Sequence, residues 1–273
     1  MITQTKTFGA AHSALFSLPP MQLSDSTAIA VPAMPVQKVV TGDAEVDAVL
    51  WLREVISTGQ ADLIHKAGLA AAKIKTPLKD LEKRYTDHLV RAHPGNWAAA
   101  FSSFGFADLE SLAERAITRS QRRHEACARF GDAIFSNTPA EQFCFEVLKR
   151  VRKGARGYGL DAAQVDKRFD ARPGQRPATL TDCIAELVYW RELYWLRQAV
   201  GDCGDTSDQV TAREDYVFRL MSRIAPRDVD EAAMVFHYLT ANDGMDRAHS
   251  GSIILNLIGA PEPYHPHKGE SDE

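Results

Sequence analysis

Residues 181–200 read TDCIAELVYWRELYWLRQAV, and this stretch says most about the fold. Successive residues of a helix turn by about 100°, so its apolar side chains surround most of the helix instead of forming one stripe. Such a helix lies at the centre of a fold or faces a partner. We favour the central position, but contact between copies of the chain through the aromatic residues stays open. These are Tyr189, Trp190, Tyr194 and Trp195, and the charged residues that need polar surroundings are Glu186, Arg191 and Glu192.

Outward from this stretch, apolar residues recur at three- and four-residue steps from Asp43 onward, which predicts helices. Thr138-Pro139-Ala140-Glu141 is a capping box with a proline inside it, and Asp228 opens a second, similar start. No block of alternating β-branched residues is present. The sequence therefore predicts an all-α protein of about nine helices in an irregular orthogonal or bundle-like array. The expected helices cover about 43–58, 61–75, 76–92, 108–130, 138–153, 181–200, 208–224, 228–241 and 246–258.

Proline and glycine divide the helical pattern. Residues 1–40 hold Pro19, Pro20, Pro32 and Pro35 and no sustained period, which predicts an extended or mobile arm. Six glycines and prolines between 154 and 178 favour a loop or linker with a soft domain boundary. The expected parts are the arm at 1–40, helical regions at 41–153 and 179–260, the linker at 154–178 and a disordered tail at 261–273.

Composition places the chain among ordinary globular proteins. With 45% hydrophobic and 25% charged residues in 273, it is not a disordered, collagen-like or disulfide-knotted chain. A formal net charge of -4 gives the whole chain no bulk attraction for nucleic acid. Four cysteines without paired spacing, and no apolar run of membrane-spanning length, predict a protein of the reducing cytoplasm that does not enter a membrane.

Residues 61–91 resemble the helix-turn-helix unit of activators of the arabinose-regulator type. Small Ala70 and the Thr76-Pro77 helix start fit that unit, and the cations that could face nucleic acid are Lys75, Lys79, Lys83 and Arg84. Two features favour an ordinary αα-hairpin instead. Ile74 occupies the turn position that usually takes glycine, and carboxylates that repel phosphate interrupt the second helix at Asp80, Glu82 and Asp87.

A second basic region lies between Arg115 and Arg176, where fourteen Lys and Arg face seven acids. Its densest cluster is Lys149, Arg150, Arg152, Lys153 and Arg156. This cluster could form a phosphate-facing patch. The favoured alternative is a set of cations that complement a helix C-terminus and lie on a solvated face.

No motif marks a catalytic residue, a cofactor site or a metal site. Gly157 to Ala162 match GxGxxA, but a basic helix precedes them where the dinucleotide motif needs a buried strand. None of the nine histidines has the helical spacing of a metal site. No nucleophile motif is present, although a catalytic triad can assemble in space without one. We therefore expect no catalytic residue, no cofactor and no metal.

Three stretches of the first half, MPVQKVV at 34–40, DLEKRYTDHL at 80–89 and VRAHPGNW at 90–97, resemble a plasmid family. This is the first-gene product of the kla (formerly kil) operon of broad-host-range conjugative plasmids. The resemblance implies a cytoplasmic accessory protein linked to cryptic tellurite resistance and to host inhibition, and it brings no catalytic residues. We therefore favour a non-enzymatic interaction protein with a protein partner, and homo-oligomerisation stays open. The alternatives are a DNA-binding regulator using 61–91 and an enzyme whose site assembles in space.

Overall fold

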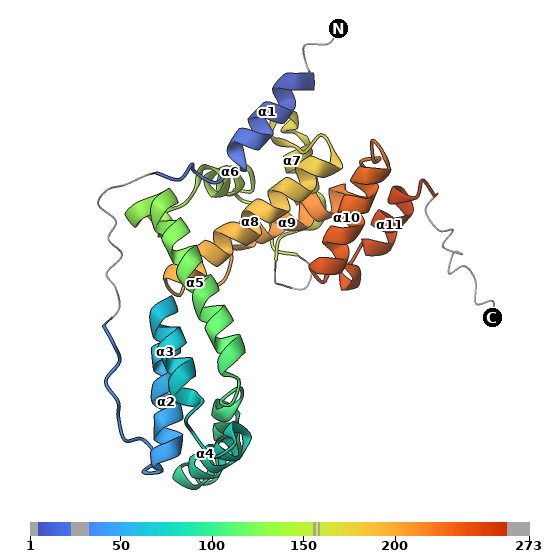
Figure 1. Cartoon of the computed structure of the whole chain (residues 1–273). Coiled ribbons are helices and arrows are strands. Elements are labelled where there is room, and N and C mark those ends of the chain that lie inside the picture. The colour runs from blue at the N-terminus through green and yellow to red at the C-terminus, as the bar shows by residue number, and fades with distance from the viewer. Residues whose placement is uncertain (1–4, 23–32, 155–156, 158, 261–273) are drawn as a thin grey trace, which may run out of the picture. The chain divides into compact units, whose positions relative to one another are not determined.

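The computed structural model describes residues 5–22, 33–154, 157 and 159–260 (Figure 1). Within these ranges the chain forms eleven α-helices and four short 3-10 helices, and no strand. The all-α prediction is confirmed. Nine of the eleven α-helices match the nine expected segments, and the predicted tail at 261–273 lies outside the described residues.

The two additional helices correct the predicted arm and linker. Helix α1 (Thr5–Leu15) lies within the expected arm, and α7 (Ala162–Asp170) lies within the expected linker. Asp161 caps α7 by accepting a hydrogen bond from Gln164 N, and Val165 and Phe169 form one buried face of that helix. Both segments are helical because tertiary packing outweighs their weak local pattern.

The described chain divides into two compact units. The first unit comprises Met1–Pro20, Phe135–Gln198 and Asp202–Glu273, and the second comprises Met21–Ile134 with Ala199–Gly201. The linker expected at 154–178 therefore falls inside the first unit, and the division comes after Ile134.

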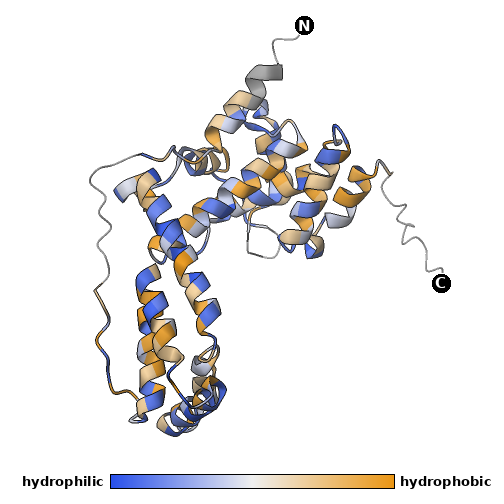
Figure 2. Cartoon of the chain, in the orientation of Figure 1, coloured by the Kyte–Doolittle hydropathy of each residue, from blue (hydrophilic) through white to orange (hydrophobic). Residues whose placement is uncertain are grey.

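Four α-helices build the second unit, and two of them carry only narrow apolar faces. Its elements are α2 (Ala44–Ser57), α3 (Ala61–Ala71), α4 (Leu78–Ala92), the 3-10 helix η1 (Trp97–Ser103) and α5 (Leu109–Phe130). Helices α4 and α5 are largely hydrophilic (Figure 2), because they bury only a few side chains against α2 and its neighbours. The buried clusters contain Val46, Val49, Leu81 and Phe106, and Leu52, Val55, Ile56 and Ala67.

Local polar contacts fix both ends of α2. Asp43 accepts hydrogen bonds from Glu45 N and Val46 N at the start of the helix. At its end Gly59 has φ +71, and a Cβ there would lie 2.7 Å from the carbonyl oxygen of Ala116. Only glycine allows this turn and this close approach to α5.

Helix α4 starts one residue later than the sequence predicts. Thr76 does not cap it, because its hydroxyl donates a 2.7 Å hydrogen bond to Glu45 Oε2 instead. Pro77 occupies the cap position without a side-chain hydrogen bond. The Thr-Pro pair therefore joins the turn to α2 and does not provide a cap.

The first unit surrounds α8 (Leu180–Val200), the stretch that the sequence placed at the centre of the fold. Its buried side chains include Leu180, Cys183, Glu186, Leu187, Tyr189, Trp190, Leu193 and Leu196, which lie on most sides of the helix. The central position is thereby observed. Around it lie α1, α6 (Pro139–Val147), α7, η3 (Pro173–Gln175), α9 (Asp208–Leu220), α10 (Val229–Ala241), η4 (Gly244–Asp246) and α11 (Ser250–Leu257) (Figure 1).

A fully buried ion pair joins α8 to α9. Arg213 donates from Nε to Glu186 Oε1 at 2.6 Å and from Nη2 to Glu186 Oε2 at 2.8 Å, and neither side chain is exposed. His12 of α1 lies 2.7 Å from the same carboxylate, and Trp190 Nε1 donates to it at 3.3 Å. Burial disfavours the charged form, but Arg213 and His12 outweigh it and hold the pKa of Glu186 below its usual value.

Aromatic rings enclose the guanidinium of Arg213. Its Cζ lies 4.9 Å from the ring centroid of Phe16 and 4.6 Å from that of Phe169. Two further rings, those of Phe143 and Tyr216, lie at 5.7 and 5.3 Å. Cation–π contacts therefore complement the ion pair, and they bring α1, α6, α7 and α9 to one buried charge.

We expect Arg213→Met to lower the free energy of unfolding by about 3–5 kcal/mol, because it leaves the buried Glu186 carboxylate without its main partner. Urea denaturation followed by tryptophan fluorescence measures this loss. The double variant Arg213→Met with Glu186→Leu should recover part of it, since both charges are then removed.

The control is Lys153→Met, which removes an exposed ion pair with Asp208 and should change stability little. Equal effects of Arg213→Met and Lys153→Met would show that the buried pair does not stabilise the first unit.

Candidate functional site

The cations of the proposed helix-turn-helix lie at the surface of the second unit. Lys75, Lys79 and Lys83 are exposed, while Arg84 lies 3.4 Å from Asp43 and 3.6 Å from Glu45. Asp80 and Asp87 are exposed on the same outer side of α4. This surface therefore carries both signs of charge, which weakens its attraction for phosphate.

The second basic cluster belongs to the first unit. Lys149, Arg150, Arg152 and Lys153 are exposed, and Lys153 forms an ion pair with Asp208. Arg156 lies outside the described residues. The two sets of cations thus belong to different units, and each is a separate candidate.

The predicted aromatic interface on α8 splits into two pairs. Tyr189 and Trp190 are 5% and 4% exposed, so they belong largely to the core and present too little surface for a protein interface. Tyr194 and Trp195 are 39% and 43% exposed, and their ring centroids lie 5.4 Å apart. Because the helix is central, only its last two turns present aromatic side chains at the surface.

A cleft of about 770 Å³ lies along this end of α8, within the first unit. Its lining comes from α6, α8, the turn at 203–207, the first half of α9 and the end of α10, with a few residues outside these elements. Three arginines, several carboxylates and several aromatic rings meet there. The lining side chains with polar or aromatic chemistry include Glu141, Trp190, Arg191, Tyr194, Trp195, Arg197, Cys203, Glu214, Tyr238 and Arg247.

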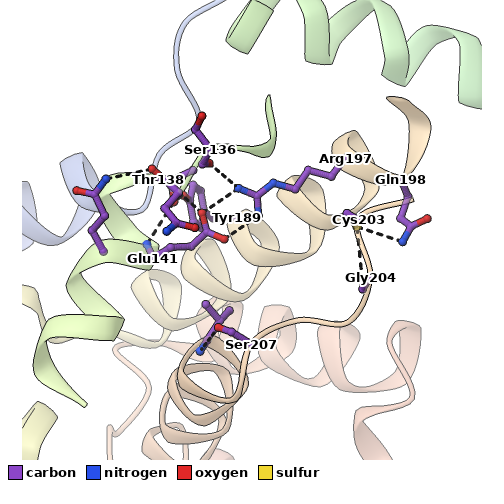
Figure 3. Close-up of polar contacts among 12 residues, drawn as sticks. Ser136, Thr138, Glu141, Tyr189, Arg197, Gln198, Cys203, Gly204 and Ser207 are labelled. Carbon is purple, nitrogen blue, oxygen red and sulfur yellow. Dashed lines mark hydrogen bonds and ion pairs between the residues drawn. The ribbon is translucent and has the colours of Figure 1, made fainter. Parts of the chain in front are cut away.

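One wall of the cleft is a hydrogen-bonded network between α6 and α8 (Figure 3). Arg197 reaches from α8 to Glu141, donating to its two carboxylate oxygens at 2.7 and 2.9 Å. The same carboxylate accepts from Thr138 N, which completes the predicted capping box, and Tyr189 donates its hydroxyl to Thr138 at 3.0 Å. Burial opposes the ionisation of Glu141, but the hydrogen bonds from Arg197 and Thr138 lower its pKa.

The other two arginines of the cleft also have partners. Arg191 donates to Asn242 Oδ1, and its Nε lies 3.6 Å from Glu192. Arg247 donates to Asp215 Oδ1 at 2.8 Å, and its Cζ lies 4.0 Å from the ring centroid of Phe218. These contacts provide the polar surroundings that the sequence required for Arg191 and Glu192; Glu186 finds its own inside the core.

Glu214 differs from the other charged residues of the cleft. Its side chain is partly buried, and within the described chain it has no hydrogen bond or ion pair. Burial raises the pKa of Glu214 to about 7, with Arg247 acting in the opposite direction. No sequence pattern marks this residue, because it stands at an ordinary position of an amphipathic helix.

An exposed aromatic cluster on η1 was also missed. Trp97, Phe101 and Phe104 are 75%, 49% and 72% exposed, and their successive ring centroids lie 5.2 and 5.0 Å apart. We call these three residues the η1 aromatic cluster. The signal was present in WAAAFSSFGF at 97–106, where four aromatic residues stand within ten positions and only Phe106 is buried.

The four cysteines are free thiols in different surroundings. Cys144 and Cys183 are buried, and burial raises the pKa of both thiols. Cys127 and Cys203 are partly exposed and belong to different units. Gln198 Nε2 donates to Cys203 Sγ at 3.1 Å beside the cleft (Figure 3).

Comparison with protein-family models, with curated proteins and with solved structures gave no match. Among the residues that the structure describes, no three His, Cys, Asp or Glu side chains are grouped to hold a metal ion. In the same part of the chain, every helix is too short or too polar to cross a bilayer.

We expect iodoacetamide to alkylate Cys127 and Cys203 in the folded protein, and Cys144 and Cys183 only after denaturation. Burial blocks access to the latter two and disfavours their thiolates. Peptide mass spectrometry with and without urea measures both sets. Comparable labelling of all four thiols in the folded protein would contradict the described core.

Proposed function

We propose that this protein is a non-enzymatic interaction protein that binds a protein partner through the η1 aromatic cluster. The observation that carries the proposal is the exposure of three neighbouring aromatic side chains, two on η1 and one at its C-cap. Aromatic residues are enriched at the centres of protein interfaces, where they provide large contact areas at low entropic cost.

The local structure supports a preformed surface. Phe104 N donates a 3.1 Å hydrogen bond to Phe101 O, and Phe106 N donates a 2.9 Å bond to Ser103 O. Ser103 is buried and accepts a 2.7 Å hydrogen bond from Thr86 of α4, while Phe106 packs in the core. The polar and apolar contacts of this segment point inward, and its remaining rings point outward. Little ordering is then required on binding.

The resemblance to the first-gene product of the kla operon suggests the setting of this interaction. We propose a cytoplasmic accessory role of the plasmid type, linked to tellurite resistance and host inhibition through a bound host protein. Thiolates are the natural partners of a soft oxyanion, but the two accessible thiols, Cys127 and Cys203, stand in separate units. An indirect action through a partner is therefore the form that we favour.

We expect Trp97→Ser with Phe104→Ser to weaken partner capture by about tenfold or more, as loss of interface anchors does. The measurement is quantitative mass spectrometry after affinity capture from host lysate, with light scattering to detect self-association. The thermal unfolding midpoint should stay unchanged, because both residues are exposed.

The matched control is Val36→Ser with Val39→Ser, which removes two apolar side chains that are 76% and 86% exposed in the same unit. It should leave capture unchanged. Equal capture by wild type and the Trp97/Phe104 variant would remove the cluster as the binding surface.

A DNA-binding regulator is the second candidate. Its support is that Lys75, Lys79 and Lys83 are exposed and form no ion pair within the described chain. It predicts retention on duplex DNA that falls steeply with salt, and Lys79→Glu with Lys83→Glu should abolish that retention. A gel-shift titration at two salt concentrations measures the retention.

The matched control is Lys66→Glu with Lys73→Glu, the same change of charge at a lysine of α3 and at one after it. Equal retention of DNA by the two double variants would reject base reading by α4.

A further inference from the structure

In the cleft of the first unit the arginines have partners, whereas several carboxylates have none among the described residues. Its arginines are each held by an acceptor: Arg191 by Asn242, Arg197 by Glu141 and Arg247 by Asp215. Three of its carboxylates, those of Asp205, Glu214 and Asp243, have no hydrogen bond or ion pair to any described residue. These carboxylates of the cleft can therefore still accept hydrogen bonds from, and form an ion pair with, a positively charged ligand.

The three carboxylates differ in position. Asp205 and Asp243 are exposed, whereas Glu214 is partly buried on α9. Water satisfies an exposed carboxylate at little cost, but a partly buried one gains more from a charged ligand because the local dielectric is lower. Glu214 is thus the anchoring group of the cleft.

Aromatic side chains line the same cleft. Tyr238 faces the charges of Glu214, Arg191 and Arg247, and Trp190 and Tyr194 contribute from α8. Aromatic rings attract organic cations and also cover apolar groups attached to them. A carboxylate combined with aromatic lining is the chemistry that recognises an amine with an apolar substituent.

We propose that this cleft binds a small organic ammonium cation, with its ammonium group on the Glu214 carboxylate and its apolar part against the aromatic lining. The site is separate from the η1 aromatic cluster, which belongs to the other unit. The two proposed sites therefore use different residues of the chain.

The surroundings of Glu214 give this binding a pH dependence. Burial raises the pKa of Glu214 to about 7, Arg247 lowers it, and Asp215 and Glu186 add to the increase. Arg191 and Tyr238 complete the titratable and charged groups on that side of the cleft. An alkyl amine stays protonated near neutral pH, so the ionisation of Glu214 controls binding. Affinity should rise about tenfold between pH 6 and pH 8, as the carboxylate becomes ionised.

The test is isothermal titration calorimetry of the full chain with phenethylammonium chloride at pH 6, 7 and 8. Sodium phenylacetate and 2-phenylethanol are the matched probes, since they keep the ring and change the charge. We expect binding of the ammonium probe alone, with affinity increasing with pH. No binding of the ammonium probe, equal or stronger binding of phenylacetate, or an affinity that does not change with pH would each overturn the proposal.

Glu214→Gln should weaken binding of the ammonium probe at pH 8 by about tenfold or more and remove the pH dependence. The matched control is Glu146→Gln, the same change at an exposed position of α6 outside the cleft, which should bind as wild type does. Equal loss in both variants would overturn the role of Glu214. The wild-type comparison of probes and pH values decides the proposal even if Glu214→Gln fails to fold.

Discussion

The ion pair between Glu186 and Arg213 organises the first unit. Neither group is exposed, and each is costly to bury without the other. Their requirement for partners explains why three helices, α1, α8 and α9, and the η3 segment converge on one place: His12, Trp190 and the carbonyl oxygen of Gln175 form hydrogen bonds with the pair. The aromatic rings then occupy the space around the guanidinium that water would otherwise fill.

The second unit is assembled differently. Helices α2 and α3 are its apolar elements, and the hydrophilic helices α4 and α5 pack against them with narrow faces (Figure 2). Here the fixed points are polar contacts at the helix ends, such as those of Asp43 and Thr76. Asp47 accepts from the backbone and hydroxyl of Thr41, and these bonds lower its pKa although burial opposes them. Such hydrogen bonds fix the conformation of the chain at the helix ends where apolar burial is limited.

Periodicity and capping residues predicted nine helices because those helices are long or have clear starts, such as Thr138 to Glu141. Helices α1 and α7 were missed because their stability comes from distant residues: His12 contacts Glu186, and Phe169 packs against Tyr216. The cleft was beyond prediction for the same reason. Its lining is drawn from residues between 135 and 247, and the partly buried Glu214 is one of them. The sequence identifies the basic residues, but it does not show whether they form one site. Their distribution between two units is a property of the fold.

The position of α1 has a consequence for the beginning of the chain. Both His12 and Phe16 are buried, one against the carboxylate of Glu186 and the other against the guanidinium of Arg213. His12 and Phe16 thus cover the buried ion pair of Glu186 and Arg213. Proteolytic removal of the segment that carries them would expose the ion pair to water, and unfolding of the first unit would begin at its centre and not at its edge.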